Sequence, residues 1–260
     1  MATTDLSTRV IVQGLRTTVV GVNVTYVPSL ESTQDEVAAL DDDDPEGSVF
    51  ITDEQTAGRG RHGRQWLAPP GTSLLLSVML RPSAEVFPKL VMVASLALAN
   101  AVEQVTGLHA EIKWPNDLLV NGKKAGGVLV EGAFFGEDPR YAAIGIGVNV
   151  NWDAMTIAGA PYPATSLSQE LGQPISRNTL AIALLNELDR LYLAAQRGEP
   201  VREAWRAKVS TLGRHVRLML DGIAVDGIAE DVDGDGALLV RSADGKLEAY
   251  YAAEVTLQEA

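Results

Sequence analysis

The sequence predicts an α+β fold in which a larger domain of strands and helices is followed by a small β-barrel domain. The chain has 260 residues, a length near which a single hydrophobic core stops growing and chains divide into domains. Strand-like and helix-like apolar patterns alternate as far as Val209, whereas only short strands separated by turns follow Gly213. We therefore expect an appended segment at 1–21, a main domain at 22–210 and the β-barrel domain at 211–260.

Period-two patterns and 3.6-residue patterns mark the elements of the main domain. The expected strands cover residues 22–27, 49–52, 73–80, 110–113, 118–120, 127–134 and 141–150. The expected helices are a short marginal one at 5–15, one capped by Ser32 or Thr33, and three at 88–106, 178–196 and 201–208. Asn121-Gly122 and the turn at 136–140 each predict a hairpin between neighbouring strands.

The β-barrel domain is predicted from four short strands at 216–220, 224–230, 237–241 and 247–251. Turns at 221–222, 233–236 and 244–245, each containing aspartate and glycine, separate these strands. The segment Asp231–Gly236 resembles the start of an EF-hand calcium loop, but Ser242 stands where such a loop carries its bidentate glutamate. We therefore interpret this segment as a hairpin turn.

The composition excludes several classes of protein. The 34 acidic and 21 basic residues give a net charge of −13, so the chain as a whole repels nucleic acids and anionic membranes. The chain has no cysteine, which excludes disulfides, thiolate zinc sites, iron–sulfur clusters and cysteine acyl-enzymes. The first residues lack the pattern of a secretion signal, and the longest apolar stretch, 90–102, is too short to span a membrane. We expect a cytoplasmic protein with no membrane partner.

An arginine-rich loop is the most unusual feature of the sequence. Residues 58–66 read GRGRHGRQW and lie within a long polar connection at 53–71. The glycines match G-x-G-x-x-G, but two prolines follow where a dinucleotide-binding turn requires a helix. Four basic side chains alternate with glycines that let backbone amides approach an anion, so we predict a loop that orders over a phosphate compound. A disordered basic loop is the weaker alternative, because long loops of that kind are uncommon in compact domains.

Three further segments carry candidate ligand contacts. Lys113 stands at a predicted strand end, directly before the letters WPND, whose Asn116-Asp117 pair favours a turn. Such a lysine can offer a point charge to a carboxylate or phosphate, although most lysines simply lie at the surface. The glycine pair Gly126-Gly127 and the alternation GIGVN at 145–149 permit close approach by a ligand or by another part of the backbone. The sequence leaves both of these explanations open.

Taken in order, these segments make the chain resemble the biotin–protein ligases. The resemblance extends from about Val22 to Leu257. Its elements are Ser32-Thr33, EQxAGRGRxGRxW at 54–66, KWPND at 113–117, KxxGxLxE at 124–131, GxGxN at 145–149, and ATSL at 164–167. The arginine-rich element and KWPND are specific in combination, because several independent motifs occur in the expected order.

The resemblance implies both a fold and a reaction. The family has a central mixed β-sheet with flanking helices, related to class II synthetases, and a C-terminal SH3-like β-barrel. Its members join biotin to ATP, forming biotinyl-5′-adenylate and pyrophosphate, and then transfer biotin to one lysine of a biotin carboxyl carrier domain. ATP and biotin are therefore expected as substrates, with Mg²⁺ accompanying ATP and no dedicated metal site held by the protein.

The resemblance also implies roles for individual residues. Lys113 and Arg61 are expected to be catalytic, because their charges offset the repulsion between the biotin carboxylate and the α-phosphate. The residues expected to contact biotin are Ser32, Thr33, Gln34, Gln55, Arg59, Gly60, Arg61, Lys113, Gly126 and Gly127. Those expected to contact the nucleotide are Arg59, Arg61, Trp66, Lys113, Asn116 and Asn149. Gln34 departs from the family, which commonly has asparagine at that position.

Three alternative functions are disfavoured by the same residues. A lipoate–protein ligase shares the fold and the adenylate chemistry, but the GRGRHGRQW loop argues against it. Octanoyltransferases of related fold need a cysteine nucleophile, which the chain lacks. A nucleic-acid-binding module conflicts with the acidic balance and the lack of further basic stripes. Because only 21 residues precede Val22, we also expect no DNA-binding repressor domain. The acceptor carboxylase and a possible homodimer stay open.

Overall fold

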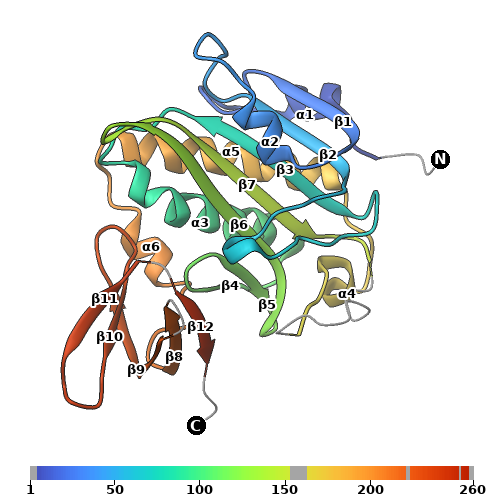
Figure 1. Cartoon of the computed structure of the whole chain (residues 1–260). Helices are drawn as coiled ribbons and strands as arrows, with labels where there is room; N and C mark the ends of the chain where they lie inside the picture. Colours follow the sequence, from blue (N-terminus) through green and yellow to red (C-terminus); the bar gives the residue numbers. More distant parts are fainter. Residues whose placement is uncertain (1–4, 153–162, 221–222, 252, 258–260) are drawn as a thin grey trace.

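The computed structural model contains two β-sheets, and most of its helices pack against the larger one (Figure 1). It describes residues 5–152, 163–220, 223–251 and 253–257. The α-helices are α1 (Thr8–Gly14), α2 (Thr33–Ala38), α3 (Leu90–Thr106), α4 (Leu167–Leu171), α5 (Arg177–Gln196) and α6 (Arg202–Arg206), and the 3₁₀ turns are η1 (Arg61–Gly63) and η2 (Phe87–Lys89). The larger sheet contains β1 (Val24–Leu30), β2 (Val49–Gln55), β3 (Ser73–Leu80), β4 (Ala110–Lys113), β5 (Asp117–Val120), β6 (Lys123–Phe135) and β7 (Asp138–Asn149). The smaller sheet contains β8 (His215–Leu220), β9 (Ile223–Val232), β10 (Leu238–Arg241), β11 (Leu247–Tyr250) and β12 (Glu254–Leu257).

The larger sheet is mixed, as the resemblance implies. Its seven strands run in the order β1-β2-β3-β7-β6-β5-β4, and the β1–β2 pair is parallel while the other described pairs are antiparallel. The strand β1 lies at the sheet edge and continues to Leu30, beyond the predicted end at Val27. It contains Pro28, which an edge strand tolerates because it has no outer neighbour to bond.

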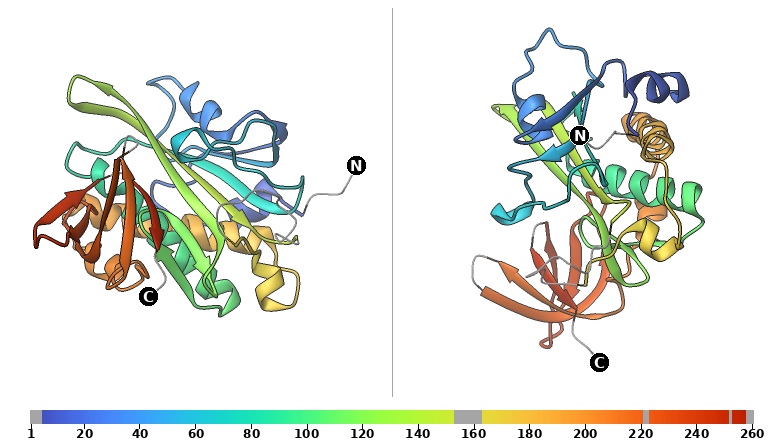
Figure 2. Two further views of the ribbon diagram at one scale, coloured as in Figure 1. Left: turned by 60° about the horizontal axis from the view of Figure 1, so that its bottom comes forward. Right: turned by 90° about the vertical axis from the view of Figure 1, so that its right-hand side faces the viewer.

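The main hydrophobic core lies between the larger sheet and the helices α3 and α5 (Figure 2). The interior strand β3 is buried at every residue, because these helices lie on one face of the sheet and α2 packs on the other. The helix α3 ends at Gly107, whose left-handed backbone (φ 69°) favours glycine. Among the residues described, no helix is both long and apolar enough to span a membrane.

The smaller sheet forms the C-terminal β domain, and its described strand pairs are all antiparallel, in the order β11-β10-β9-β8-β12. Two hydrogen bonds of Trp114 connect it to the larger sheet. The indole Nε1 donates to the Gly236 carbonyl at 2.8 Å, and the backbone N–H donates to Thr211 Oγ1 at 3.0 Å. The residue that follows Lys113 is thereby fixed by the C-terminal part of the chain, and the predicted α+β arrangement is confirmed.

The amino-terminal segment packs on α5 and adds to the main core. Asp189 of α5 is buried and accepts hydrogen bonds from the backbone N–H groups of residues 18–20 at 2.8–3.0 Å. Arg177, at the start of α5, is also buried and donates to Asp5 at 2.6 Å and to Asp53 at 2.7 Å. Because Asp53 belongs to β2, this arginine connects the amino-terminal segment, α5 and the larger sheet.

Several local features differ from the sequence prediction because their signals are short. The strand β2 continues to Gln55, so the polar connection begins later than expected. The strand β12 and the helix α4 were not predicted, and α4 is a single turn capped by the Ser166 side chain, which accepts the N–H of Gln169. The Asp233 carboxylate accepts two backbone N–H groups in the predicted turn between β9 and β10. The turn predicted at 221–222 lies outside the described residues.

Replacing Arg177 should destabilise the protein strongly. Arg177→Met leaves the Asp53 carboxylate, whose side chain is only 14% exposed, without this cation, and we expect to lose roughly 3 to 5 kcal/mol of unfolding free energy. The control Arg217→Met removes an exposed pair with Asp226 and should cost less than about 1 kcal/mol. Urea unfolding followed by circular dichroism measures both losses. Equal losses of unfolding free energy in the two variants would show that the buried ion pair does not stabilise the fold more than an exposed one.

Candidate active site

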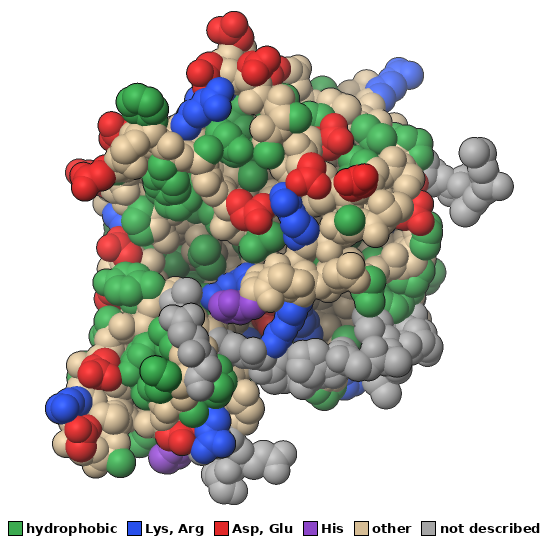
Figure 3. Space-filling model, in the orientation of Figure 1, with side chains coloured by type: hydrophobic (Ala, Val, Ile, Leu, Met, Phe, Trp, Pro, Cys, Tyr) green, Lys and Arg blue, Asp and Glu red, His purple; other side chains and the backbone are tan. Residues whose placement is uncertain are grey.

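A cavity of about 610 Å³ opens on the face of the larger sheet that carries α2. Its walls come from the start of α2, the end of β2, the loop at 56–72, the turn after β4, the strands β6 and β7, and two residues at β12. Figure 3 shows Lys, Arg and His side chains gathered around a hollow between the two sheets. The predicted site residues that line the cavity are Ser32, Thr33, Gln34, Gln55, Arg59, Gly60, Arg61, Trp66, Lys113, Asn116, Gly127 and Asn149. Gly126 is the exception.

Polar side chains meet at one end of the cavity, where α2 begins. Ser32 caps this helix, because its Oγ accepts the N–H of Gln34 at 3.3 Å. Gln55 Oε1 accepts both the backbone N–H and the hydroxyl of Thr33, at 2.8 and 3.0 Å. These two donors orient the Gln55 amide, whose Nε2 donates no hydrogen bond to the described residues. This end of the cavity therefore offers an amide donor beside two hydroxyl groups.

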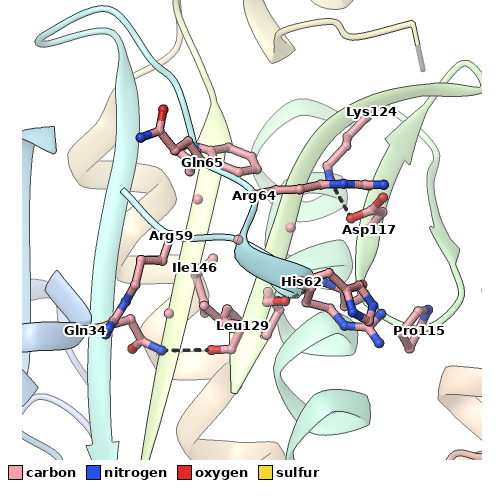
Figure 4. Close-up of a pocket in the computed structure, with 18 of the residues that line it drawn as sticks. Gln34, Arg59, His62, Arg64, Gln65, Pro115, Asp117, Lys124, Leu129 and Ile146 are labelled. Atoms are coloured by element: carbon pink, nitrogen blue, oxygen red, sulfur yellow. Dashed lines mark hydrogen bonds and ion pairs between the residues drawn. The ribbon is translucent and has the colours of Figure 1, made fainter. Parts of the chain in front are cut away.

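The side chain of Gln34 is buried at the same end and has a fixed orientation (Figure 4). Its Nε2 lies 3.0 Å from Glu131 Oε2 and 3.4 Å from each of the carbonyl oxygens of Leu129 and Ala143. Three acceptors around one atom decide which side of the amide carries the nitrogen. The opposite atom, Oε1, is buried and accepts no hydrogen bond from the described residues. A ligand N–H would relieve the cost of about 1–3 kcal/mol that such an acceptor carries.

Two glycines on β7 provide room for the cavity side chains. A Cβ on Gly145 would lie 3.0 Å from the Gln34 side chain, and one on Gly147 would lie 2.6 Å from the Trp66 ring. Close approach, one of the two explanations that the sequence left open, is therefore explained here by side chains that pack on bare backbone. Glycine is needed at residue 126 for a different reason. A Cβ there would point away from the cavity and lie 3.0 Å from the Gly147 carbonyl oxygen.

The arginine-rich loop folds into a short hairpin beside the cavity. Arg59 and Gln65 form an antiparallel bridge, and η1 makes the tip. At this tip His62 has a left-handed backbone (φ 56°), which residues other than glycine seldom adopt. Arg59 Nη2 forms ion pairs with Asp35 of α2 at 2.9 Å and with Glu131 of β6 at 3.1 Å. The base of the loop is thus attached to two neighbouring elements.

Arg61 lies deeper than Arg59 and carries a less compensated charge. Its Nη1 donates to Asn116 Oδ1 at 3.2 Å, which is its one hydrogen bond to the described residues. Burial lowers the pKa of the Arg61 guanidinium from its ordinary value, the Asp117 charge acts against this change and the Arg64 charge adds to it. An arginine stays protonated nonetheless, because its ordinary pKa lies far above neutral pH. Arg61 is therefore a cation placed to receive an anion.

Lys113 ends β4 with its side chain in the cavity wall and is 6% exposed. This burial excludes the alternative of a plain surface lysine. The chain reverses directly after it, at residues 114–116, where the Trp114–Pro115 peptide is cis. Asp117 already begins β5 and pairs with Lys113, so the turn predicted at Asn116-Asp117 lies earlier than expected. The Asn116 side chain in this turn faces Arg61.

Three charged residues of the cavity, Arg64, Asp117 and Lys124, were not predicted as site residues. Lys124 Nζ lies 2.6 Å from Asp117 Oδ1 and 5.8 Å from the centre of the Trp66 ring (Figure 4). Both Lys124 and Asp117 line the cavity. Lys124 belongs to the motif KxxGxLxE and Asp117 to KWPND, and this membership was the sequence signal that could have identified them as site residues. The sequence did not show which strand residues point into the cavity.

The far end of the cavity offers further unpaired polar atoms. Asn149 is buried, and its Nδ2 donates to the Thr165 carbonyl at 2.9 Å. Neither Asn149 Oδ1 nor Trp66 Nε1 has a hydrogen-bond partner among the described residues. The Thr165 hydroxyl donates to Glu170 at 2.5 Å and, with Asn121 and Lys123, lowers the pKa of that carboxyl. This anchored segment holds the Asn149 side chain in the cavity wall.

The cavity therefore has two chemically different ends joined by cations. Figure 4 shows Gln34 and Arg59 at one end and Asp117 and Lys124 at the other. Amide and hydroxyl groups dominate the first end, Lys113 and Arg61 add positive charge, and the second end carries an aromatic ring. Such a cavity suits a ligand with a neutral polar head, an anionic centre and a flat ring.

Comparison with known proteins decides the family. The model described as the biotin/lipoate A/B protein ligase family matches residues 26–149, and the biotin protein ligase C terminal domain matches residues 211–257. The bifunctional ligase/repressor BirA of Bacillus subtilis is 33% identical over 250 residues, which cover 94% of this chain and 77% of that relative. This chain belongs to the biotin protein ligase family. The biotin--[acetyl-CoA-carboxylase] ligase of Paracoccus denitrificans is 34% identical over 209 residues, which are 77% of this ligase chain and 87% of that protein.

Solved structures of biotin protein ligases share the fold of this ligase. The Aquifex aeolicus enzyme in complex with biotin and ATP has a TM-score of 0.78 and 25% identity, covering 92% of this chain and 100% of that one. The Leishmania major enzyme in complex with biotinyl-5-AMP has a TM-score of 0.61 and 26% identity, covering 89% and 99% of the two chains. The mixed sheet with its C-terminal β domain is therefore the fold of the family, as predicted.

A Cβ at residue 147 should loosen the arginine-rich loop. In Gly147→Ala the new methyl group would lie 2.6 Å from the Trp66 ring, so the ring must move and the loop that carries it must follow. We expect faster hydrogen–deuterium exchange across residues 56–72. The control Gly234→Ala meets no atom within 4 Å and should leave this exchange unchanged. Unchanged exchange in Gly147→Ala would show that Trp66 does not hold the loop.

Proposed function

We propose that this protein is a biotin–protein ligase that makes biotinyl-5′-adenylate from biotin and ATP and then transfers biotin to a lysine of a carrier domain. The observation that carries the proposal is the placement of Lys113 and Arg61 in the wall of one cavity that also holds an amide-lined end. The family of the chain and the two solved complexes above, one with biotin and ATP and one with biotinyl-5-AMP, support it. The proposal places the reaction in the cytoplasm.

The amide-lined end suits the ureido head of biotin. A ureido group has one carbonyl acceptor and two N–H donors, so it needs partners of both kinds. Gln55 Nε2 and the hydroxyl of Ser32 can donate to the carbonyl. The unpartnered Gln34 Oε1 can accept an N–H. The extra methylene that distinguishes Gln34 from the usual asparagine fits here because Gly145 leaves room for it.

The first chemical step joins two anions and needs positive charge. A biotin carboxylate oxygen attacks the α-phosphorus of ATP, the bond to the β-phosphate oxygen breaks, and pyrophosphate leaves with that electron pair. Lys113 and Arg61 stabilise the charge that grows on the phosphoryl oxygens, and their burial strengthens this effect. Mg²⁺ is expected to arrive as part of the ATP substrate. Trp66, Asn116 and Asn149 would hold the nucleotide.

The second step uses an amine from a partner protein. The carrier lysine attacks the carbonyl carbon of the adenylate, AMP leaves, and the amine loses a proton as the amide forms. The arginine-rich hairpin lies beside the cavity and would shield the mixed anhydride from water until the carrier arrives. The partner we propose is a biotin carboxyl carrier protein or domain of a carboxylase. We propose no DNA partner, and a homodimer is a question for solution measurements.

Lys113→Ala should slow adenylate formation by about 10²- to 10³-fold, because it removes a charge that stabilises the transition state. The control Lys246→Ala removes an exposed lysine of the smaller sheet region and should leave the rate unchanged. Pyrophosphate release in a single turnover with biotin and MgATP measures both rates. A normal rate in Lys113→Ala would remove this residue from the chemistry.

The substrate should be biotin and not lipoate. The protein should transfer biotin, in a reaction that depends on ATP, to a purified carboxyl carrier domain, and lipoate should give less than about 1% of that rate because its dithiolane ring has no N–H for the buried Gln34 acceptor. Mass spectrometry of the carrier measures both products. Efficient lipoylation of a lipoyl domain would favour the lipoate ligase alternative.

A further inference from the structure

One oxygen atom of Glu131 holds two parts of the candidate site that belong to different elements. Glu131 Oε2 accepts from Gln34 Nε2 at 3.0 Å and lies 3.1 Å from Arg59 Nη2. Gln34 belongs to α2, Arg59 to the arginine-rich loop and Glu131 to β6. Glu131 itself does not line the cavity. A residue that touches both a ligand-facing amide and the loop can transmit the position of one to the other.

The Gln34 amide depends on Glu131 for its direction. Of the three acceptors around Nε2, Glu131 is the nearest and carries a charge, whereas the two carbonyls stand at the limiting distance of 3.4 Å. Hydrogen bonds to charged groups are roughly twice as strong as neutral ones. Without the carboxylate, only these two long contacts would oppose rotation of the amide by half a turn, which exchanges the positions of Oε1 and Nε2. The cavity would then present a donor where an N–H of a ligand needs an acceptor.

The loop depends on Glu131 through Arg59. The guanidinium has two carboxylates, Asp35 and Glu131, and both are partly exposed, with side-chain exposures of 49% and 43%. Asp35 holds the loop to α2 but makes no contact with the Gln34 amide among the described residues. Glu131 therefore does what Asp35 does for the loop and, in addition, orients the amide. This difference provides a matched comparison within the same chain.

We propose that Glu131 is a positioning residue that couples the place of the arginine-rich loop to the orientation of the Gln34 acceptor. The inference rests on the proposed function, because it treats the ligand N–H as that of biotin. When the loop lies on β6, Arg59 adds positive charge beside Oε2 and holds the carboxylate in the position from which it orients Gln34. Ligand capture by Gln34 and closure by the loop then favour each other. Glu131 makes no contact with the reacting atoms, so it should affect binding more than chemistry.

Four proteins test the coupling: the native chain, Glu131→Ala, Glu131→Gln and Asp35→Ala. Glu131→Ala should weaken biotin binding about tenfold, because the Gln34 amide would no longer be held with Oε1 toward the biotin N–H. A loss of this size is expected when one hydrogen bond between a ligand and a buried acceptor is not made. The rate of adenylate formation at saturating biotin should fall less than about threefold, because Lys113 and Arg61 are untouched. Asp35→Ala should weaken biotin binding less than about threefold, because exposed ion pairs contribute little and Gln34 keeps its partner.

Glu131→Gln separates positioning from a general loss of stability. Its side-chain carbonyl can still accept from Gln34, so biotin binding should return to within about threefold of the native value. Calorimetry with biotin gives the affinities, single-turnover pyrophosphate release gives the chemical rate, and thermal unfolding checks that each variant is folded.

Three results would overturn the coupling. They are equal losses of affinity in Glu131→Ala and Asp35→Ala, native affinity in a folded Glu131→Ala, and no recovery in a folded Glu131→Gln. Failure of the proposed function would look different, because the native chain itself would then not bind biotin.

Discussion

Positive charge concentrated in one cavity of an acidic chain is the constraint on which the site depends. The net charge is −13, yet Arg59, Arg61, Arg64, Lys113 and Lys124 all line the same cavity. Five cations around one cavity repel one another unless nearby groups hold them apart or balance them. The structure does this unevenly, since Arg59 and Lys124 have carboxylate partners while Arg61 has the neutral side chain of Asn116. The less compensated charge is the one best able to receive a phosphate.

The rest of the fold serves to keep these cations in place. The turn after β4 positions Asn116 beside Arg61, and the indole of Trp114 ties that turn to the C-terminal domain. Bare backbone at Gly147 lets the Trp66 ring pack down, which draws the arginine-rich loop onto the sheet. The buried Arg177 connects the strand that leads into this loop with α5 and the amino-terminal segment. Segments far apart in the sequence thus support one small volume.

The order of motifs was enough to predict the fold and the family, because each motif combines rare residue types at a fixed spacing, and all predicted site residues except Gly126 line the cavity. The direction of individual side chains was not predictable. Gly126 and Gly127 are neighbours on one strand and face opposite sides, so only Gly127 lines the cavity. Lys124 and Glu131 were part of the motif at 124–131 but were given no role in the site, since their roles depend on partners such as Asp117 and Gln34 in other elements. The ion pair between Asp5 and Arg177 joins residues too distant for any local pattern to reveal.

A crystal structure of the protein with biotinyl-5′-adenylate tests the central claim most directly, because it locates both ends of the ligand at once. We predict the ureido group within hydrogen-bond distance of Gln55 and of Gln34 Oε1, and the phosphate against Lys113 and Arg61. We also predict the adenine ring beside Trp66. A ligand bound in the reverse direction, or with its phosphate away from Lys113 and Arg61, would show that the two ends of the cavity do not have the proposed roles.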